Sequence, residues 1–313
     1  MTSHDLPQLA GDRMFITDGG METFLIFHHG IDLPCFASFT LLADEEGTET
    51  LRSYFDDYFA IARERELGLL LDTVTWRASR QWGEQLGYSP DDIEGVNRRA
   101  VLLAQEIRAE HEEDGTPTAI AGCVGPRRDA YSADDAMSPA EAEMYHSAQI
   151  ETLADAGAEF VSALTLTNTS EAVGIARAAH AAGIPAVISF TVETDGRLPN
   201  GQTLRYAIEQ TDAETDASPA YYMVNCAHPT HFAHVLDGDA WVERIRGVRA
   251  NGSPKSHQEL DEADELDSDE PADLAACHRA LFDCLPDLTV IGGCCGTDHR
   301  HVAALSSARL AHT

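Results

Sequence analysis

The sequence predicts an α/β protein, a single (β/α)8 TIM barrel that spans residues 1–313. Eight short apolar runs are continuous rather than alternating, which is typical of parallel strands covered on both faces. A helical segment follows each run, and the length fits a barrel of about 250 residues plus insertions. A doubly wound open sheet is the competing architecture. No G-x-G-x-x-G or P-loop motif follows the first run, which disfavours the nucleotide-binding form of that sheet.

The expected elements alternate along the whole chain. The strands are expected at Met14–Asp18, Gly68–Val74, Thr118–Cys123, Glu159–Leu164, Ala186–Thr191, Tyr221–Asn225, Gly247–Ala250 and Leu288–Gly292. The helices are expected at Glu49–Glu66, Ile93–Glu112, Ala140–Ala156, Ser170–Ala182, Leu204–Thr211, Thr230–Leu236, Ala272–Cys284 and His299–Leu310. Ser89 and Ser138 each precede a proline and are followed by an acid three residues on, which is a helix-start signal.

An acidic segment, Glu259–Glu270, is expected as an insertion between the seventh strand and its helix. A run of charges usually forms a solvated surface loop, and this is the simpler interpretation. A lid is the alternative, because the loops that follow the strands surround the active face of a barrel.

The charge of the chain is strongly negative. Fifty-three acidic residues against 21 basic ones give a net charge of −32, and this field disfavours nucleic acid and anionic membranes as partners. Lys255 is the single lysine, and a carboxylate-rich surface suits a salt-rich cytoplasm that screens its self-repulsion. We therefore expect a halophilic host. The polar start Met1–Ala10 and the lack of an apolar run of about 18 residues indicate a cytoplasmic protein without a membrane span.

Three of the seven cysteines fall at the ends of the sixth and eighth strands. Cys226 ends the sixth strand, and Cys294 and Cys295 end the eighth, inside Gly-Gly-Cys-Cys-Gly-Thr. In a barrel these ends open on the catalytic face, with one strand between them, so the three sulfurs can converge. Three thiolates suit a catalytic Zn²⁺ with one open position, where a substrate thiol is activated as the thiolate.

Other interpretations of these cysteines stay open at this point. They are a redox pair, simple packing, or a structural zinc whose fourth ligand is one of the nearby histidines, His228, His299 or His301. The remaining four cysteines are expected to be packing residues: Cys35, Cys123, Cys277 and Cys284.

Three motifs resemble the homocysteine S-methyltransferase family. They are the Gly-Gly-Cys-Cys-Gly-Thr run, the pair Asn225-Cys226, and the segment Asp18-Gly19-Gly20-Met21-Glu22-Thr23. The resemblance spans roughly 18–297. It implies a zinc-dependent methyltransferase whose three cysteines hold the metal, with homocysteine thiolate as the fourth ligand and a small-molecule methyl donor. It also implies that Asp18 binds the ammonium group of homocysteine, with backbone N–H groups of Gly19 and Gly20 near the amino-acid end.

The chain departs from the family pattern at Leu164, where the family usually has a glutamate that assists in binding homocysteine. We expect Glu193 to replace it from a neighbouring loop. Trp76 is expected to contact a cationic methyl donor through its ring. An inward-pointing Arg77 would disfavour such a donor.

Three alternatives to a stand-alone homocysteine enzyme remain. They are a module that presents homocysteine to a separate cobalamin protein, a methyltransferase for another thiol or selenol, and a non-enzymatic zinc protein. The sequence leaves the oligomeric state open, a homo-oligomer included.

Overall fold

The computed structural model describes residues 6–11, 13–111, 115–131, 136–263 and 265–312. Eight parallel strands form a closed barrel in which each strand pairs with the next along the chain, and β8 pairs with β1. The strands are β1 (Phe15–Ile16), β2 (Gly68–Asp72), β3 (Thr118–Val124), β4 (Phe160–Leu166), β5 (Ala186–Phe190), β6 (Tyr221–Asn225), β7 (Ile245–Ala250) and β8 (Val290–Gly293). The predicted (β/α)8 barrel is thereby confirmed.

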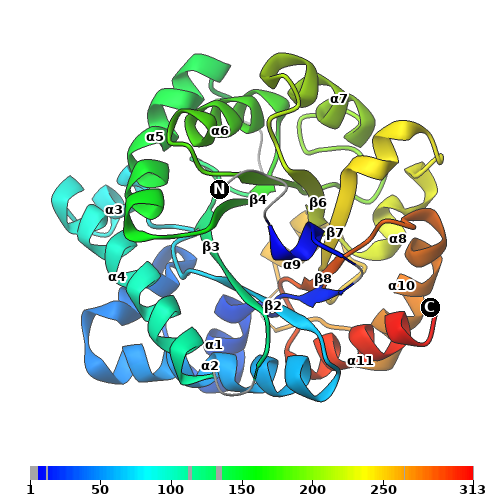
Figure 1. Cartoon of the computed structure of the whole chain (residues 1–313), viewed down its shortest axis with the longest axis horizontal. Helices are drawn as coiled ribbons and strands as arrows, with labels where there is room; N and C mark the ends of the chain where they lie inside the picture. The colour runs from blue at the N-terminus through cyan, green and yellow to red at the C-terminus, as the bar shows by residue number, and fades with distance from the viewer. Residues whose placement is uncertain (1–5, 12, 112–114, 132–135, 264, 313) are drawn as a thin grey trace.

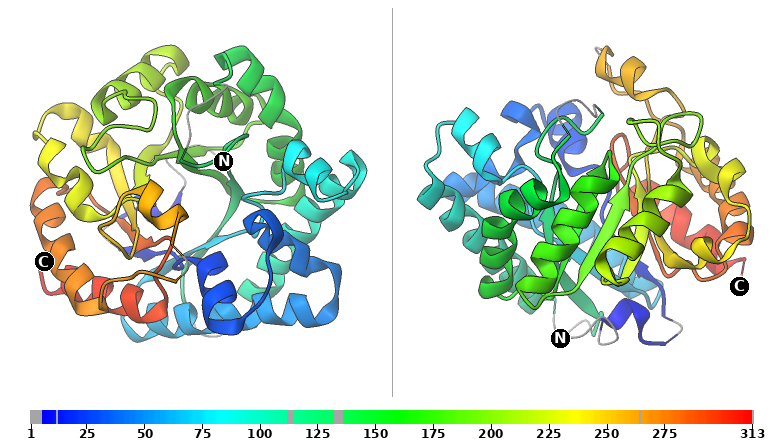
Figure 2. Two further views of the ribbon diagram at one scale, coloured as in Figure 1. Left: turned by 180° about the vertical axis from the view of Figure 1, so that it is seen from behind. Right: turned by 90° about the horizontal axis from the view of Figure 1, so that it is seen from above.

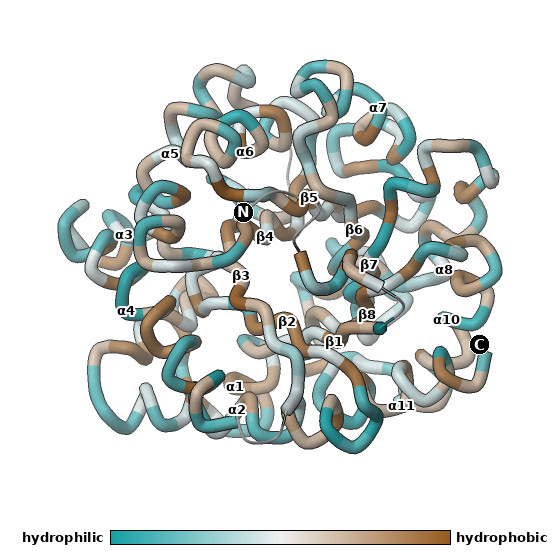
Figure 3. Tube along the Cα trace, viewed as in Figure 1, coloured by the Kyte–Doolittle hydropathy of each residue, from teal (hydrophilic) through white to brown (hydrophobic). Residues whose placement is uncertain are grey.

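Most of the helices form a ring outside the strands, as Figure 1 shows. The helices are α1 (Met21–His29), α2 (Glu45–Glu64), α3 (Arg80–Gln85), α4 (Pro90–Glu110), α5 (Pro139–Ala156), α6 (Thr169–Ala181), α7 (Leu204–Thr215), α8 (Pro229–Phe232), α9 (His257–Asp261), α10 (Pro271–Cys284) and α11 (His299–Leu310). Figure 3 shows hydrophobic residues gathered on the central strands, while the peripheral helices alternate between hydrophobic and hydrophilic stretches. Within the described residues, no helix combines the length and apolar composition that crossing a membrane requires.

The structure agrees with the predicted elements except for three helices. All eight strands form, and Ser89 and Ser138 each close a capping box at the start of α4 and α5. Helices α1, α3 and α9 were not predicted. Helix α1 begins directly after Gly19-Gly20, a pair that indicates a turn, and α3 and α9 are too short to show a helical period. Glu112, the last residue of one predicted helix, lies outside the described residues.

The N-terminal end of the barrel is closed by the chain itself. Leu6 is fully buried, and Gln8, in a short 3-10 helix (Pro7–Leu9), donates a hydrogen bond of 3.2 Å from Nε2 to the hydroxyl of Tyr221. Figure 2 shows this segment at the opposite end of the molecule from α9. The cavity described below lies at the other end of the barrel, where its lining residues come from the carboxyl ends of the strands and the loops that follow them.

The acidic segment lies in the connection between β7 and α10, and Figure 2 shows α9 standing above the rim of the barrel. Its described residues Leu260, Asp261 and Asp267 line the cavity below, and Asp267 accepts hydrogen bonds from Ser253 and Lys255. The described residues of the segment are exposed or half-buried although several line the cavity, so the lid and the solvated loop both stay predictions. That the segment is an insertion stays a prediction, and Asp264 lies outside the described residues.

Candidate active site

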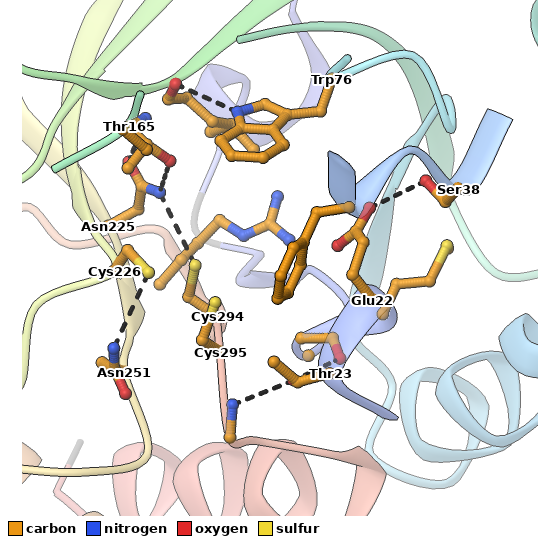
Figure 4. Close-up of a pocket in the computed structure, with 18 of the residues that line it drawn as sticks. Glu22, Thr23, Ser38, Trp76, Thr165, Asn225, Cys226, Asn251, Cys294 and Cys295 are labelled. Atoms are coloured by element: carbon orange, nitrogen blue, oxygen red, sulfur yellow. Dashed lines mark hydrogen bonds between the residues drawn. The ribbon is translucent and has the colours of Figure 1, made fainter. Parts of the chain in front are cut away.

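The three cysteine thiols converge at the carboxyl ends of β6 and β8. Their sulfur atoms all lie within 4.8 Å of one another, close to the spacing of about 3.8 Å that tetrahedral Zn–S bonds of 2.3 Å require. Asn251 donates an amide hydrogen to the sulfur of Cys226 at 3.7 Å, and Asn225 donates to that of Cys294 at 3.8 Å. Figure 4 shows both contacts and the three sulfurs turned toward one another. The residues therefore fit a thiolate-bound zinc ion.

The backbone that carries the cysteines is fixed by the neighbouring strands. Cys226 has a positive φ of 52°, and its N–H donates to the carbonyl of Arg249 at 3.0 Å. The N–H of Cys294 donates to the carbonyl of Ala250 at 2.7 Å, so β7 holds both sides of the cluster. A Cβ atom on Gly20 would clash with the carbonyl oxygen of Cys294, which explains the glycine at this close approach.

The backbone N–H of Gly20, which was expected near the amino-acid end of the substrate, has another partner in the structure. The N–H of Gly20 donates to the carbonyl of Thr297 at 3.0 Å, so it is already used within the protein. Gly19 and Gly20 do line the cavity, but their contribution in the structure is a close approach between β1 and the loop after β8.

The three thiols differ in pKa. Hydrogen bonds from Cys294 and Cys295 lower the pKa of Cys226 well below its ordinary value. The same bonds to Cys226 raise the pKa of Cys294 to about 12 and that of Cys295 well above its ordinary value. The hydroxyl of Tyr131 lies 3.2 Å from the sulfur of Cys226 and adds a further donor. A bound cation would deprotonate all three thiols, because metal coordination removes the thiol proton.

Within the described residues, no histidine, carboxylate or further cysteine joins the three thiols, and the nearest other polar group is the hydroxyl of Tyr131. The three histidines considered as a structural fourth ligand are paired with carboxylates elsewhere, as His228–Asp269, His299–Asp57 and His301–Asp298. An open position on the metal favours catalysis, since structural zinc sites are closed by four protein ligands.

Glu193 lies behind the cysteine cluster rather than in the cavity. Its carboxylate contacts Nδ1 of His257 at 3.0 Å, and Nε2 of His257 donates to the carbonyl of Cys226 at 2.8 Å. The ring of His257 also stacks on Tyr131, with 4.1 Å between ring centroids. Glu193 is not among the residues that line the cavity, and in this structure its carboxylate supports the Cys226 loop through His257.

A cavity of about 470 Å³ lies against the cysteines, a volume typical of small-molecule sites. The exposed rings of Phe27 and Phe36 lie at its edge, with Trp76 and Leu164 deeper in. Its charged side chains include Asp18, Glu22, Asp72, Arg77 and Arg249. The cavity thus combines apolar walls with a few buried charges.

Asp18 is buried and already has a cationic partner. Arg249 donates from Nη2 to Asp18 Oδ1 at 2.5 Å and from Nη1 to Asp72, and Tyr54 donates to Asp18 Oδ2 at 3.2 Å. Burial raises the pKa of Asp18 to about 7, although the charge of Arg249 acts in the opposite direction. The expectation that Asp18 faces a substrate ammonium directly is therefore not met in this structure. Two buried strands carry a charged residue near their carboxyl ends, Asp72 on β2 and Arg249 on β7. These charges could have indicated the buried ion pairs, but the sequence interpretation overlooked them.

Leu164 and Trp76 lie together in the cavity wall. The β4–β5 pairing shifts register between Ala163 and Leu166, and Trp76 donates from Nε1 to the carbonyl of Leu164 at 3.4 Å. The guanidinium carbon of Arg77 lies 4.0 Å from the centre of the Trp76 ring and 3.9 Å from that of Trp82. Arg77 lines the cavity, but its guanidinium is held between the two indole rings and donates to the carbonyl of Arg128, so one cation already contacts Trp76 in this structure. A donor contact through Trp76 stays a prediction.

Comparisons with known proteins agree with this architecture. A family model described as Homocysteine S-methyltransferase matches residues 15–309. Homocysteine S-methyltransferase 4 of Zea mays is 26% identical over 94% of this chain and 88% of its own length. Selenocysteine Se-methyltransferase of Brassica oleracea var. italica is 24% identical over 93% of this chain and 87% of its own. The metallated form of the homocysteine methyltransferase MmuM from Escherichia coli matches with a TM-score of 0.76 at 22% identity, over 98% of this chain and 99% of that one, and so shares the fold.

Proposed function

Because the chain belongs to the homocysteine S-methyltransferase family and is a methyltransferase, we propose that it transfers a methyl group from a small-molecule donor to the thiolate of homocysteine, forming methionine. We further propose that Zn²⁺ binds to Cys226, Cys294 and Cys295. The observation that carries the proposal is the convergence of three thiols from the ends of β6 and β8 at the wall of one cavity, with no histidine, carboxylate or further cysteine in the group among the described residues.

A zinc ion on these thiolates would offer its open position to the acceptor thiol and keep it deprotonated. The protein holds the site rigid through the amide donors Asn225 and Asn251 and through the backbone bonds of both cysteine loops to β7. Amide donors to the ligating sulfurs orient them, as hydrogen-bonding neighbours of metal ligands generally do.

The transfer is a displacement in which the acceptor sulfur bonds to the methyl carbon as the bond from methyl to the donor atom breaks. A sulfonium or quaternary ammonium donor leaves as a neutral thioether or amine, and the thiol proton passes to solvent. The chain contributes by aligning the two reactants in the cavity, where its apolar rim excludes water. No side chain is required as a general base.

The test combines metal content with turnover. We expect about one zinc per chain in the wild type purified in high salt, since the cluster can hold a single ion. We expect none in Cys294→Ser, and wild-type content in Cys284→Ser, which alters a cysteine on α10 outside the cavity. Methionine formation from homocysteine is then assayed with sulfonium and quaternary ammonium donors. Full zinc retention in Cys294→Ser contradicts the metal site, and turnover only with a methylcobalamin protein favours the presenting module.

A selenol acceptor is the second candidate. The Brassica protein named for selenocysteine is nearly as similar to this chain as the maize protein named for homocysteine, at 24% against 26% identity. Parallel assays with selenocysteine decide between them, and a kcat/KM for selenocysteine above that for homocysteine would make the selenol the better substrate.

A further inference from the structure

Glu22 is a carboxylate in the cavity that the thiol cluster does not use. It lies in the first turn of α1, and Ser38 donates a hydrogen bond to its Oε1 at 2.8 Å. Among the described residues no cation forms a direct ion pair with Glu22, although the charges of Arg249 and Arg77 interact with it from a longer distance. Figure 4 shows its side chain entering the cavity opposite the cysteine sulfurs. An acidic group in a mostly apolar cavity without a cationic partner is costly unless a ligand supplies one.

The other two buried carboxylates of the cavity differ from Glu22 in this respect. Asp18 and Asp72 both accept from the guanidinium of Arg249, whose Nε also donates to the carbonyl of Gly293 at 3.2 Å. Burial lowers the pKa of Arg249, but the charges of Asp72 and Asp18 raise it above the ordinary value, so the guanidinium keeps its charge. A ligand cation placed at Asp18 would therefore face the fixed positive charge of Arg249.

The electrostatic surroundings of Glu22 show that it lies near the thiol site. Burial raises its pKa and the charge of Cys294 raises it further, while the hydrogen bond from Ser38 and the positive charge of Arg249 lower it. A cation that binds between Glu22 and the cysteines would offset both the burial and the repulsion.

Two cations could reach this cavity in a methyl transfer, and their behaviour during the reaction distinguishes them. The onium centre of the donor loses its charge as the methyl group leaves, so a carboxylate beside it would stabilise the ground state more than the transition state and slow the reaction. The ammonium group of an amino-acid acceptor keeps its charge throughout. A carboxylate there stabilises substrate and transition state alike, which aids binding at no cost in rate.

We propose that Glu22 binds the ammonium group of the amino-acid acceptor and so makes the site selective for an α-amino thiol or selenol. This rests on the proposed function. Leu164, which also lines the cavity, has an apolar side chain and cannot pair with an ammonium group. The acceptor is then held at two points, its sulfur at the cysteine cluster and its ammonium at the start of α1.

The test measures binding of two ligands to the zinc-loaded protein by calorimetry. Homocysteine is compared with 4-mercaptobutanoate, which is the same thiol without the amino group. We expect the wild type to prefer homocysteine by roughly 10-fold to 100-fold, as a charge-assisted hydrogen bond gives. We expect Glu22→Gln to lose most of this preference. Glu265→Gln removes the same charge from the exposed rim of the cavity and should change the ratio far less.

Kinetics supply the second measurement. Glu22→Gln should raise the KM for homocysteine with kcat and the donor KM unchanged, because the lost interaction is the same in ground and transition states. A wild-type preference that survives in Glu22→Gln refutes the role of Glu22 while leaving the proposed function intact. A raised donor KM with an unchanged homocysteine KM also refutes it and assigns Glu22 to the donor. A wild type that binds neither thiol refutes the proposed function and this inference together.

Discussion

Replacing Arg249 by methionine removes the one guanidinium that two buried carboxylates share. Arg249 and Asp18 are 5% and 4% exposed, and Arg249 donates to both Asp18 and Asp72. Breaking a buried ion pair from one side typically costs about 3–5 kcal/mol, because the remaining charge is left without compensation. With a urea m-value of about 3 kcal/mol/M, the unfolding midpoint of Arg249→Met should fall by roughly 1–1.7 M.

The pH dependence of this loss has a definite sign. The pKa of Asp18 is raised from 3.8 to about 7 in the folded protein, so its ionisation lowers stability as the pH rises from about 4 to 7. Without Arg249 the folded-state pKa rises further. The deficit of Arg249→Met relative to wild type is then largest above pH 7 and shrinks toward pH 5, where the carboxylates take up protons.

The control variant neutralises the whole group, as Arg249→Met with Asp18→Asn and Asp72→Asn. Neutral replacement of a complete buried ion network is often close to neutral for stability, so most of the loss should be recovered. The assay is urea unfolding followed by circular dichroism at pH 5.5 and pH 8. If the free energy of unfolding of Arg249→Met alone lies within about 0.5 kcal/mol of the wild-type value at pH 8, the buried ion network does not stabilise the fold as argued, since changes of that size are ordinary for surface positions.

Three further outcomes are expected. Gly20→Ala should lose zinc and activity, since its Cβ would push against the carbonyl of Cys294, and zinc content measures this; full metal content would contradict the packing. His257→Ala should weaken zinc binding by about 10-fold to 100-fold in a chelator competition, because it frees the Cys226 carbonyl, and an unchanged affinity would exclude that positioning role. The wild type, with a net charge of −32, should melt at a temperature several degrees higher in 2 M than in 0.2 M KCl, and a salt-independent melting temperature would count against a halophilic host.

The barrel and the cysteine cluster could both be predicted from the sequence. Each depends on local patterns, namely the apolar runs that form strands and the cysteines that follow two of them. Eight buried parallel strands read as eight continuous apolar runs, and β6 has the predicted bounds, Tyr221–Asn225. Once the strands are assigned, barrel topology alone brings Cys226 near Cys294 and Cys295. No knowledge of side-chain direction was needed for that step.

The partners of the cavity charges could not be predicted in the same way. Asp18 was placed correctly at the cavity, but its pairing with Arg249 joins residues 231 positions apart and depends on which way a strand-end side chain turns. Glu193 was assigned to substrate because it follows a strand, and the structure turns it toward His257 instead. Glu22 lies in the segment Asp18–Thr23, but Gly19 and Gly20 indicate a turn, so the sequence did not predict the helix that carries its carboxylate at the cavity.

The charges of the cavity explain why a carboxylate is needed at Glu22 rather than at Asp18. Arg249 occupies Asp18, and like charges keep an ammonium group away from the guanidinium. Removing both the Arg249 guanidinium and the Glu22 carboxylate should therefore allow the ammonium group to bind at Asp18. In Arg249→Met combined with Glu22→Gln, Asp18 has no cationic partner, and we expect the preference for homocysteine over 4-mercaptobutanoate to return above that of Glu22→Gln alone. Binding is measured where circular dichroism shows the variant folded. An equal ratio in the two variants would mean that Arg249 does not determine where the ammonium binds.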